Sequence, residues 1–415
     1  MPPKRTSKKH SKCSTPLVAA ITGVIVFGCV MAGLWFRSNE KDALVDELEF
    51  YHVKMEKTIF KQTQEREYVL RATKGIRKGE TIFQIPRFLC VSEEDVAQSA
   101  IGIDLTRRAA DVDRALESSG SSPSFKQILR FAFYIATEKR NPLSPLQRWF
   151  NSIPLFDRST GGALFWDDED LKCLDSATLW EAQTLRTGLL SSHAVSNIIC
   201  DEDEGCSGGP LSLEELRWAL AVYFHYNLRD QAIVPFLTFA RFTAVNFGVD
   251  VRVNRNSGGL DVVANDIFAE NAEIGVYYPR GPGGQFVARG VVDMSALGVD
   301  ARIDLREALT SQSGRSVCVD HSHEMMFGSN GRPREALIKC YAWLASDEHE
   351  RRRIDSYATN VDLMDRVRKD LHHVVSQALL QIPRSCASSH AISRKIEELN
   401  NFTRIVLQRN LDFLE

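Results

Sequence analysis

Several motifs of common protein chemistry are missing from this chain. There is no Cys-x-x-Cys pair, so the usual spacing of a structural zinc site is absent. There is no Gly-x-Ser-x-Gly phrase, the turn that presents the serine of an α/β-hydrolase. The Gly281–Gly284 cluster lacks the Lys and Ser or Thr that complete a phosphate-binding loop, and a hairpin turn explains it.

Charge of one sign is not in excess either. The formal net charge is −3, which gives no reason to expect a nucleic-acid partner. His321 and His323 stand between acidic residues in Asp320–Glu324, a combination that metal sites use, but a solvated loop is the preferred interpretation. We therefore predict neither a metal nor a nucleic acid for this chain.

One long apolar run is present near the N-terminus. Leu17–Phe36 holds 20 residues without a charge and ends in two aromatic residues, Trp35 and Phe36. A helix of this length matches the hydrocarbon thickness of a bilayer, and aromatic residues favour its interface. The run predicts a transmembrane signal-anchor. The alternative is a cleaved signal peptide, for which Val30 and Ala32 offer a small-residue cleavage site.

The charges beside this run predict its orientation. The tip at residues 1–16 carries five Lys and Arg residues and no acid. By the positive-inside rule the N-terminus is then cytosolic, and the body lies in a lumen or outside the cell, in an organelle that the sequence does not name. Cys200 and Cys206 bracket a short acidic loop, and both a disulfide and two free thiols remain open for them.

The order of the remaining patterns indicates an α+β protein. A polar linker at 37–48 precedes β signals from about 49 to 105, including Glu67–Thr73 and Thr81–Ile85. Helical periodicity follows from about 125 to 230, and short β phrases return from Ile233 to about Asp304. After about 332 the chain is predicted to be helical, in long segments separated by the charged 347–353 cluster and by Pro383.

Two apolar stripes mark the C-terminal helical segments. Their members are spaced three or four residues apart, as packing against a core requires. The first stripe contains Leu363, Val367, Leu371, Val374 and Ala378; the second contains Ile396, Leu399, Phe402, Ile405 and Leu411.

Two distant phrases carry a family resemblance. Leu70–Pro86 and Ala272–Tyr278, with a helical stretch between them, resemble a SET-domain methyltransferase of the Rubisco-methyltransferase and actin-histidine-methyltransferase type. Asn141–Ser144 followed by Trp149, and Ile233–Pro235, fit the same order. The resemblance implies a SET domain at 49–305 with a helical insert at about 125–230. It also implies a helical C-terminal domain at 306–415, like the substrate-binding domain of Rubisco LSMT, that contacts a protein substrate or partner.

The resemblance also implies an activity and a set of site residues. Tyr278 falls at the family's catalytic tyrosine, whose phenol positions the acceptor nitrogen of a protein lysine or histidine for in-line methyl transfer. The implied cofactor is S-adenosylmethionine. Its implied contacts are Arg71, Tyr68, Arg241, Phe242 and Phe286.

The sequence departs from the family where this cofactor binds. A Gly-x-Gly phrase is replaced by Glu67-Tyr68-Val69, whose side chains fill space that glycine leaves open. The family's Asp-x-x-Asn-His phrase reads Thr238–Phe242 here. Two hypotheses follow: a membrane-anchored methyltransferase with intact or weakened activity, or a catalytically inactive SET-fold module that binds protein.

Overall fold

The computed structural model describes most of the chain beyond its N-terminal segment. The described residues are 53–62, 68–121, 125–153, 155–200, 206, 208–228, 232–234, 241–243, 248–254, 257–277, 287–288, 301–302, 326–328, 330–351, 360–384, 386 and 391–415. The chain divides into two compact units, Met1–Lys54 and Met55–Glu415. Only Val53 and Lys54 of the first unit are described, and β1 (Lys54–Met55) crosses the boundary.

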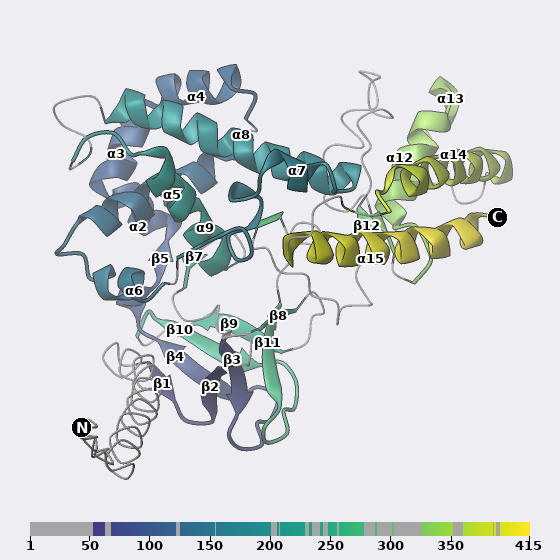
Figure 1. Ribbon diagram of the computed structural model, residues 1–415. Coiled ribbons are helices and arrows are strands. Elements are labelled where there is room, and N and C mark those ends of the chain that lie inside the picture. Colours follow the sequence, from purple (N-terminus) through teal and green to yellow (C-terminus); the bar gives the residue numbers. More distant parts are fainter. Residues whose placement is uncertain are drawn as a thin grey trace, which may run out of the picture. The chain divides into compact units, whose positions relative to one another are not determined.

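The second unit is built on one mixed sheet. Its strand order is β4-β10-β9-β11-β3-β2, with β8 beside β11 (Figure 1). The strands are β2 (Thr58–Gln62), β3 (Tyr68–Ala72), β4 (Thr81–Ile85), β8 (Arg241–Thr243), β9 (Val249–Val253), β10 (Leu260–Ala264) and β11 (Glu273–Tyr277). β9, β10 and β11, from after the helical insert, therefore lie between β4 and β3, which come from before it.

Alternation along the strands explains which face is covered. Leu70 and Ala72 of β3 are buried, whereas Arg71 between them is half-buried. In β4 the adjacent Ile82 and Phe83 are both buried, so both faces of the sheet are covered at this strand. Because successive strand residues point to opposite faces, the face that carries Leu70 and Ala72 belongs to the core.

A series of helices lies between β5 (Val91–Ser92) and β6 (Asn227–Leu228) in the chain. They are α2 (Glu93–Gln98), α3 (Ala100–Arg107), α4 (Ala109–Ser118), α5 (Phe125–Arg140), α6 (Gln147–Ser152), α7 (Asp168–Leu171), α8 (Ser176–Ile199) and α9 (Leu213–Tyr226). Among the described residues, α-helical structure thus begins at Glu93, after a short 3-10 helix at Arg87–Leu89, so the prediction of β structure up to about residue 105 is wrong there. A capping box between Ser92 and Asp95, followed by an acidic first turn, starts α2.

Two small sheets accompany the main one. The first has the strand order β5 (Val91–Ser92), β7 (Ala232–Ile233), β6 (Asn227–Leu228). The second pairs β12 (Ala301–Arg302) with β13 (Met326–Phe327). Through β5 and β7, the chain just before the helices pairs with the chain just after them.

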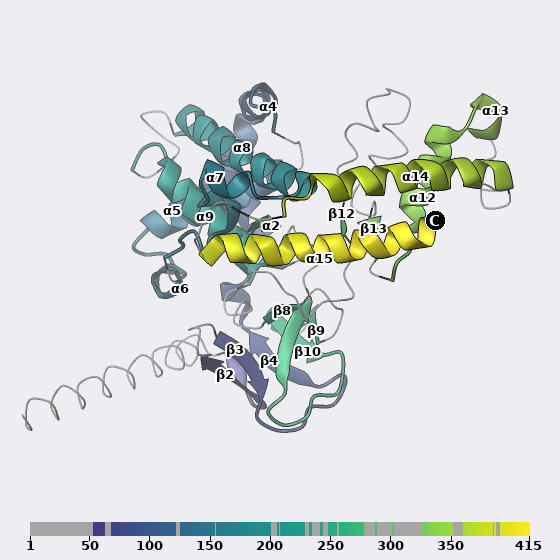
Figure 2. The ribbon, with the colours of Figure 1, turned by 45° about the vertical axis from the view of Figure 1, so that its right-hand side comes forward.

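The C-terminal part is helical, as predicted. It contains α12 (Glu335–Ala345), α13 (Glu348–Arg351), α14 (Val361–Gln381) and α15 (Ala391–Leu414). In Figure 2, α14 and α15 lie side by side as a hairpin. Leu363, Val367, Leu371 and Val375 of α14 are buried in a core that Phe402 and Val406 of α15 share. Ile405 of the predicted stripe instead points outward and is 46% exposed.

Candidate functional site

Strand β11 brings together the segments that the sequence singled out. Its first residues pair antiparallel with β3, with Glu273 opposite Arg71 and Ile274 opposite Leu70. Its last residues pair in parallel with β8, where Gly275 lies opposite Arg241. The register then places Val276 opposite Phe242 and Tyr277 opposite Thr243. The distant phrases Leu70–Pro86 and Ala272–Tyr278 are therefore paired through β3 and β11.

Backbone hydrogen bonds fix the register between β3 and β11. Ala72 N donates to Ala272 O at 2.9 Å, and Asn271 N donates to Ala72 O at 2.8 Å. Asn271 takes a φ of 66°, a left-handed conformation that asparagine tolerates better than most residues. Further along, Ile76 and Phe268 exchange two hydrogen bonds of 2.9 Å, which join the 73–80 turn to the loop before β11.

An ion pair anchors the same turn at its other side. Lys57 Nζ lies 2.7 Å from Glu80 Oε2, which also accepts a 2.9 Å bond from the Arg77 backbone N–H. The hydrogen bond from Lys57, followed by that from Arg77, lowers the pKa of Glu80. The carboxylate thus stays ionised and holds the turn against the start of β2.

Close backbone approach at β11 requires a glycine. Gly248, just before β9, has a φ of 135°, and a Cβ on it would overlap the carbonyl oxygen of Gly275. Val276, the residue after Gly275, pairs in parallel with Val249 of β9. Glycine at position 248 therefore lets β9 approach β11 while β11 also pairs with β8.

Arg71 is the predicted site residue whose side chain the structure describes. Its side chain is half-buried, and its Nε is shielded from solvent without a hydrogen-bond partner in the described part of the chain. A buried donor without a partner costs free energy, about 1–3 kcal/mol. Such a cost is common where a ligand supplies the missing acceptor. Arg71 can therefore receive an anionic group.

The other predicted site residues are placed by their backbones or lie outside the description. Tyr68 belongs to β3, and Arg241 and Phe242 belong to β8, but their side chains are not described. Tyr278 directly follows the last residue of β11 and lies outside the described residues, as does Phe286. The backbone thus brings Tyr68, Arg71, Arg241 and Phe242 onto strands that pair with β11.

A second unusual arginine was not predicted. Arg217 of α9 also has a shielded Nε without a hydrogen-bond partner among the described residues, and its guanidinium lies 5.7 Å from the Phe165 ring centroid. On the same helix, His225 lies 4.7 Å from the ring of Phe156, and its Nδ1 is 2.8 Å from Ala221 O. The eight-residue spacing of Arg217 and His225 puts both on one side of α9. This spacing could have been recognised in the sequence.

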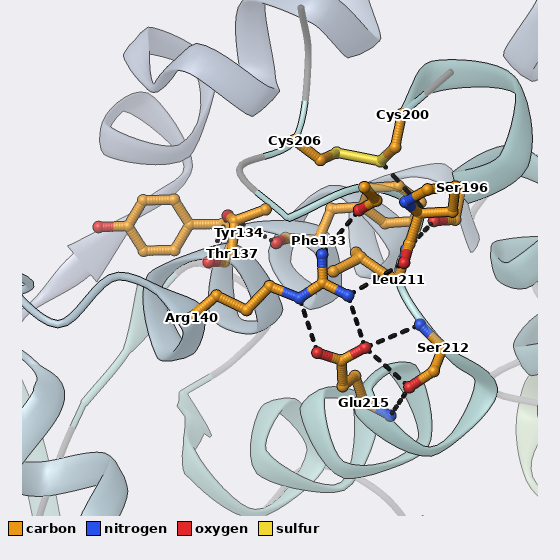
Figure 3. Close-up of polar contacts among 12 residues, drawn as sticks. Phe133, Tyr134, Thr137, Arg140, Ser196, Cys200, Cys206, Leu211, Ser212 and Glu215 are labelled. Carbon is orange, nitrogen blue, oxygen red and sulfur yellow. Dashed lines mark hydrogen bonds and ion pairs between the residues drawn. A yellow bond between two sulfur atoms is a disulfide. The ribbon is translucent and has the colours of Figure 1, made fainter. Parts of the chain in front are cut away.

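An ion pair secures the start of α9 to the end of α5 (Figure 3). Arg140 Nε and Nη2 lie 2.7 and 2.8 Å from the two oxygens of Glu215, and Arg140 Nη1 donates to Gly209 O at 2.6 Å. Ser212 N and Oγ also donate to Glu215. These contacts, the hydrogen bond from Arg140 first, lower the pKa of Glu215 to about 2. Such a bidentate pair fixes the orientation of α9.

A disulfide closes the loop beside this ion pair. Cys200 and Cys206 are bonded, so of the two possibilities left open by the sequence the disulfide is the one present. Cys340 is also disulfide-bonded, and its partner is not among the described residues. Figure 3 shows the bond next to Ser196, whose Oγ accepts a 2.6 Å hydrogen bond from Leu211 N. The loop after α8 is thereby held at both ends.

Features of two other site classes are absent from the described residues. No group of three or more potential metal ligands occurs among the described residues, and Asp320–Glu324 lies outside them. Among the described helices, none combines the length and hydrophobicity of a membrane span. The predicted anchor at 17–36 also lies outside the described residues.

Comparison with known proteins gives matches in structure and none in sequence. No protein-family profile and no curated protein sequence matches the chain. Among solved structures, the SET domain of LSMT bound to lysine and AdoHcy matches with a TM-score of 0.62 and 13% identity, over 91% of each chain. Rubisco LSMT bound to AdoMet matches with a TM-score of 0.63 and 13% identity, over 90% of this chain and 91% of that one.

A further structure agrees with these two. Rubisco LSMT bound to sinefungin and monomethyllysine gives a TM-score of 0.61 at 12% identity, again over 90% of this chain and 91% of that one. The predicted resemblance to this branch of SET proteins is confirmed at the level of structure. The chain therefore has the α+β SET-type fold of Rubisco LSMT, with its helices in the C-terminal part.

Proposed function

We propose that this chain is a protein N-methyltransferase that modifies lysine or histidine side chains with S-adenosylmethionine. The observation that carries the proposal is the meeting of β3 and β8 on β11, the strand that leads directly to Tyr278. The likeness to LSMT structures that hold AdoMet or AdoHcy supports it.

The cofactor fits the described residues at one point. When bound, S-adenosylmethionine supplies an electrophilic methyl group on a sulfonium. Arg71, with its shielded and unpartnered Nε, would hold the carboxylate of its amino-acid part. The backbones of Tyr68, Arg241 and Phe242 lie on the neighbouring strands, and these residues with Phe286 are proposed to complete the contacts.

Tyr278 is the proposed catalytic residue. Its phenol oxygen would orient the acceptor nitrogen along the line of transfer, a contribution worth several kcal/mol in comparable sites (about 3–4 for a single well-placed group). In this role the phenol forms no covalent bond with either reactant.

A second candidate function keeps the fold without the chemistry. The phrases Glu67-Tyr68-Val69 and Thr238–Phe242 differ from the family pattern on the cofactor side. These differences favour a catalytically inactive module that binds a protein through its C-terminal helices. Exposed apolar residues on those helices, such as Leu380 at 77% and Val361 at 72% exposure, offer contact area to such a partner.

Calorimetry separates the two candidates. The purified full-length chain in detergent is titrated with S-adenosylmethionine, and saturable micromolar binding supports the enzyme. If millimolar ligand produces no heat of binding, the enzyme proposal fails and the inactive protein-binding module is the remaining candidate. If the ligand binds, a labelled methyl group is then traced into protein, and amino-acid analysis after acid hydrolysis distinguishes methyllysine from methylhistidine.

We further propose that residues 17–36 anchor the chain and that its body is lumenal or extracellular. The basic tip at 1–16 supports this orientation. The two bonded cysteines Cys200 and Cys206 and the bonded Cys340 support an oxidising compartment. In sealed vesicles from expressing cells, protease added outside should spare the body; its digestion before detergent is added would reverse the orientation.

A further inference from the structure

Two free thiols from distant parts of the chain lie against each other. Cys173, just after α7, is buried, and Cys386, between α14 and α15, is half-buried. Burial first, and then a hydrogen bond with the Cys173 thiol, raise the pKa of Cys386 to about 12. The helical insert and the C-terminal helices therefore meet at a pair of sulfur atoms.

Hydrogen bonds hold both backbones at this contact. The buried Asn400 of α15 donates from Nδ2 to Cys173 O at 2.8 Å and to Pro383 O at 3.3 Å. Cys386 N donates to Glu397 Oε1 at 3.1 Å. One amide side chain thus ties the segment of each thiol to the other, so the two sulfur atoms are kept close without a covalent bond.

The remaining cysteines set this pair apart. Cys200–Cys206 is already a disulfide, and Cys340 is bonded as well. Cys90 is free and buried, and its thiol donates to Pro86 O at 3.6 Å. Among the free cysteines of the described residues, Cys173 and Cys386 are thus the two whose thiols contact each other.

We propose that Cys173 and Cys386 form a further disulfide bond, a covalent modification that joins the helical insert to the connection between α14 and α15. The oxidant is a low-molecular-weight disulfide. The thiolate of the more exposed Cys386 attacks it, which forms a mixed disulfide and releases one thiol. The Cys173 thiolate then attacks the Cys386 sulfur and releases the second thiol. The oxidant takes up two electrons, and the two cysteine protons end on the released thiols.

The same environment controls the rate. Because the thiolate is the nucleophile, the raised pKa of Cys386 makes oxidation slow at neutral pH and faster as pH rises. Once formed, the bond closes a very long loop, which restricts the unfolded chain strongly. The proposal does not depend on methyltransferase activity.

The test maps the bond in the full-length protein. The protein is equilibrated with mixtures of oxidised and reduced glutathione, free thiols are blocked with N-ethylmaleimide, and peptides are analysed by mass spectrometry without reduction. We expect a cross-linked peptide pair containing Cys173 and Cys386, whose share grows with the oxidised fraction. Recovery of both residues as maleimide or separate glutathione adducts at every ratio, with Cys200–Cys206 intact, would refute the bond.

Variants give a second readout. Oxidation should raise the melting temperature of the wild type by about 5 °C or more, and should leave Cys386→Ser unchanged. Cys90→Ser is the matched control, because Cys90 is free and buried but contacts no second thiol among the described residues; it should keep the rise. An equal rise in Cys386→Ser would contradict the proposal.

Discussion

The carbonyl oxygen of Gly275 occupies the space that a side chain on Gly248 would need. Gly248 also has a φ of 135°, which few residues with a Cβ adopt. This contact allows β9 to lie against β11 at the point where β11 passes from β3 to β8. We therefore expect the two glycines to control whether the site strands assemble.

Gly248→Ala should lower the free energy of unfolding by about 3 kcal/mol or more, because backbone overlap adds to conformational strain. Urea unfolding measures the loss. Gly79→Ala is the matched control: Gly79 has a φ of 86° but open space around it, so only strain of about 1 kcal/mol applies. Equal losses in the two variants would show that the Gly248–Gly275 contact is unimportant.

Arg71→Met should weaken S-adenosylmethionine binding by about 10- to 100-fold, the value of a charged hydrogen bond. Stability should change by less than about 0.5 kcal/mol or rise, because the Arg71 Nε has no hydrogen-bond partner to lose among the described residues. Calorimetry and thermal unfolding measure the two effects. The exposed Arg77→Met serves as control. Unchanged affinity in Arg71→Met would remove Arg71 from the cofactor site.

Tyr278→Phe should lower turnover by about 100-fold while cofactor affinity stays within about twofold, because a group that acts on the transition state changes kcat and not ligand binding. Transfer of labelled methyl to protein, measured with calorimetry on the same sample, separates the effects. Tyr277→Phe is the neighbouring control. Full turnover in Tyr278→Phe would move catalysis to another residue.

The Arg140–Glu215 pair predicts a pH dependence of stability. The pKa of Glu215 is lowered from 4.5 to about 2 in the folded chain. A lowered folded-state pKa means that the contribution is complete above about pH 4.5 and is lost as the pH falls toward 2. Because Glu215 is partly exposed, the contribution is about 1 kcal/mol. Between pH 6 and 2.5, the free energy of unfolding should therefore fall less steeply in Glu215→Gln than in the wild type.

A control separates this pair from the remaining carboxylates. Glu169 pairs with Lys172 on the surface, with 72% of its side chain exposed. Glu169→Gln should therefore retain the wild-type pH profile. If Glu215→Gln and the wild type lose stability in parallel, the Arg140 contact does not hold the carboxylate in its ionised form.

The strands and C-terminal helices were predictable because their periodicity is strong. Thr81–Ile85 was predicted as a strand and is β4, and the segments after residue 332 are the helices α12 to α15. Periodicity fails at finer scale: Ile405 was assigned to an apolar stripe but is exposed, and Val406 is buried instead. Val374 packs against the core, but the adjacent Val375 is the fully buried residue. Because a helix has 3.6 residues per turn, a spacing of three or four residues does not determine which of two adjacent apolar residues is buried.

The start of α2 was missed for a different reason. Val91 and Ser92 form a short strand immediately before a capping box, and the apolar residues that follow fit either a strand or a helix. The acidic triplet Glu93–Asp95 was the usable sign of a helix start. The pairing of β3 and β8 with β11 could be inferred only by resemblance, because no local pattern encodes contacts between residues so far apart in sequence.

The order in which the sheet strands leave the ribosome has a consequence for biosynthesis. β2, β3 and β4 are made first, but β3 and β4 receive their second neighbours, β11 and β10, only after the whole helical region has been synthesised. Until then, strand edges remain open to wrong pairing. Nascent chains that stall within the helical region should accordingly depend on chaperones, whereas chains that have passed Tyr277 should not.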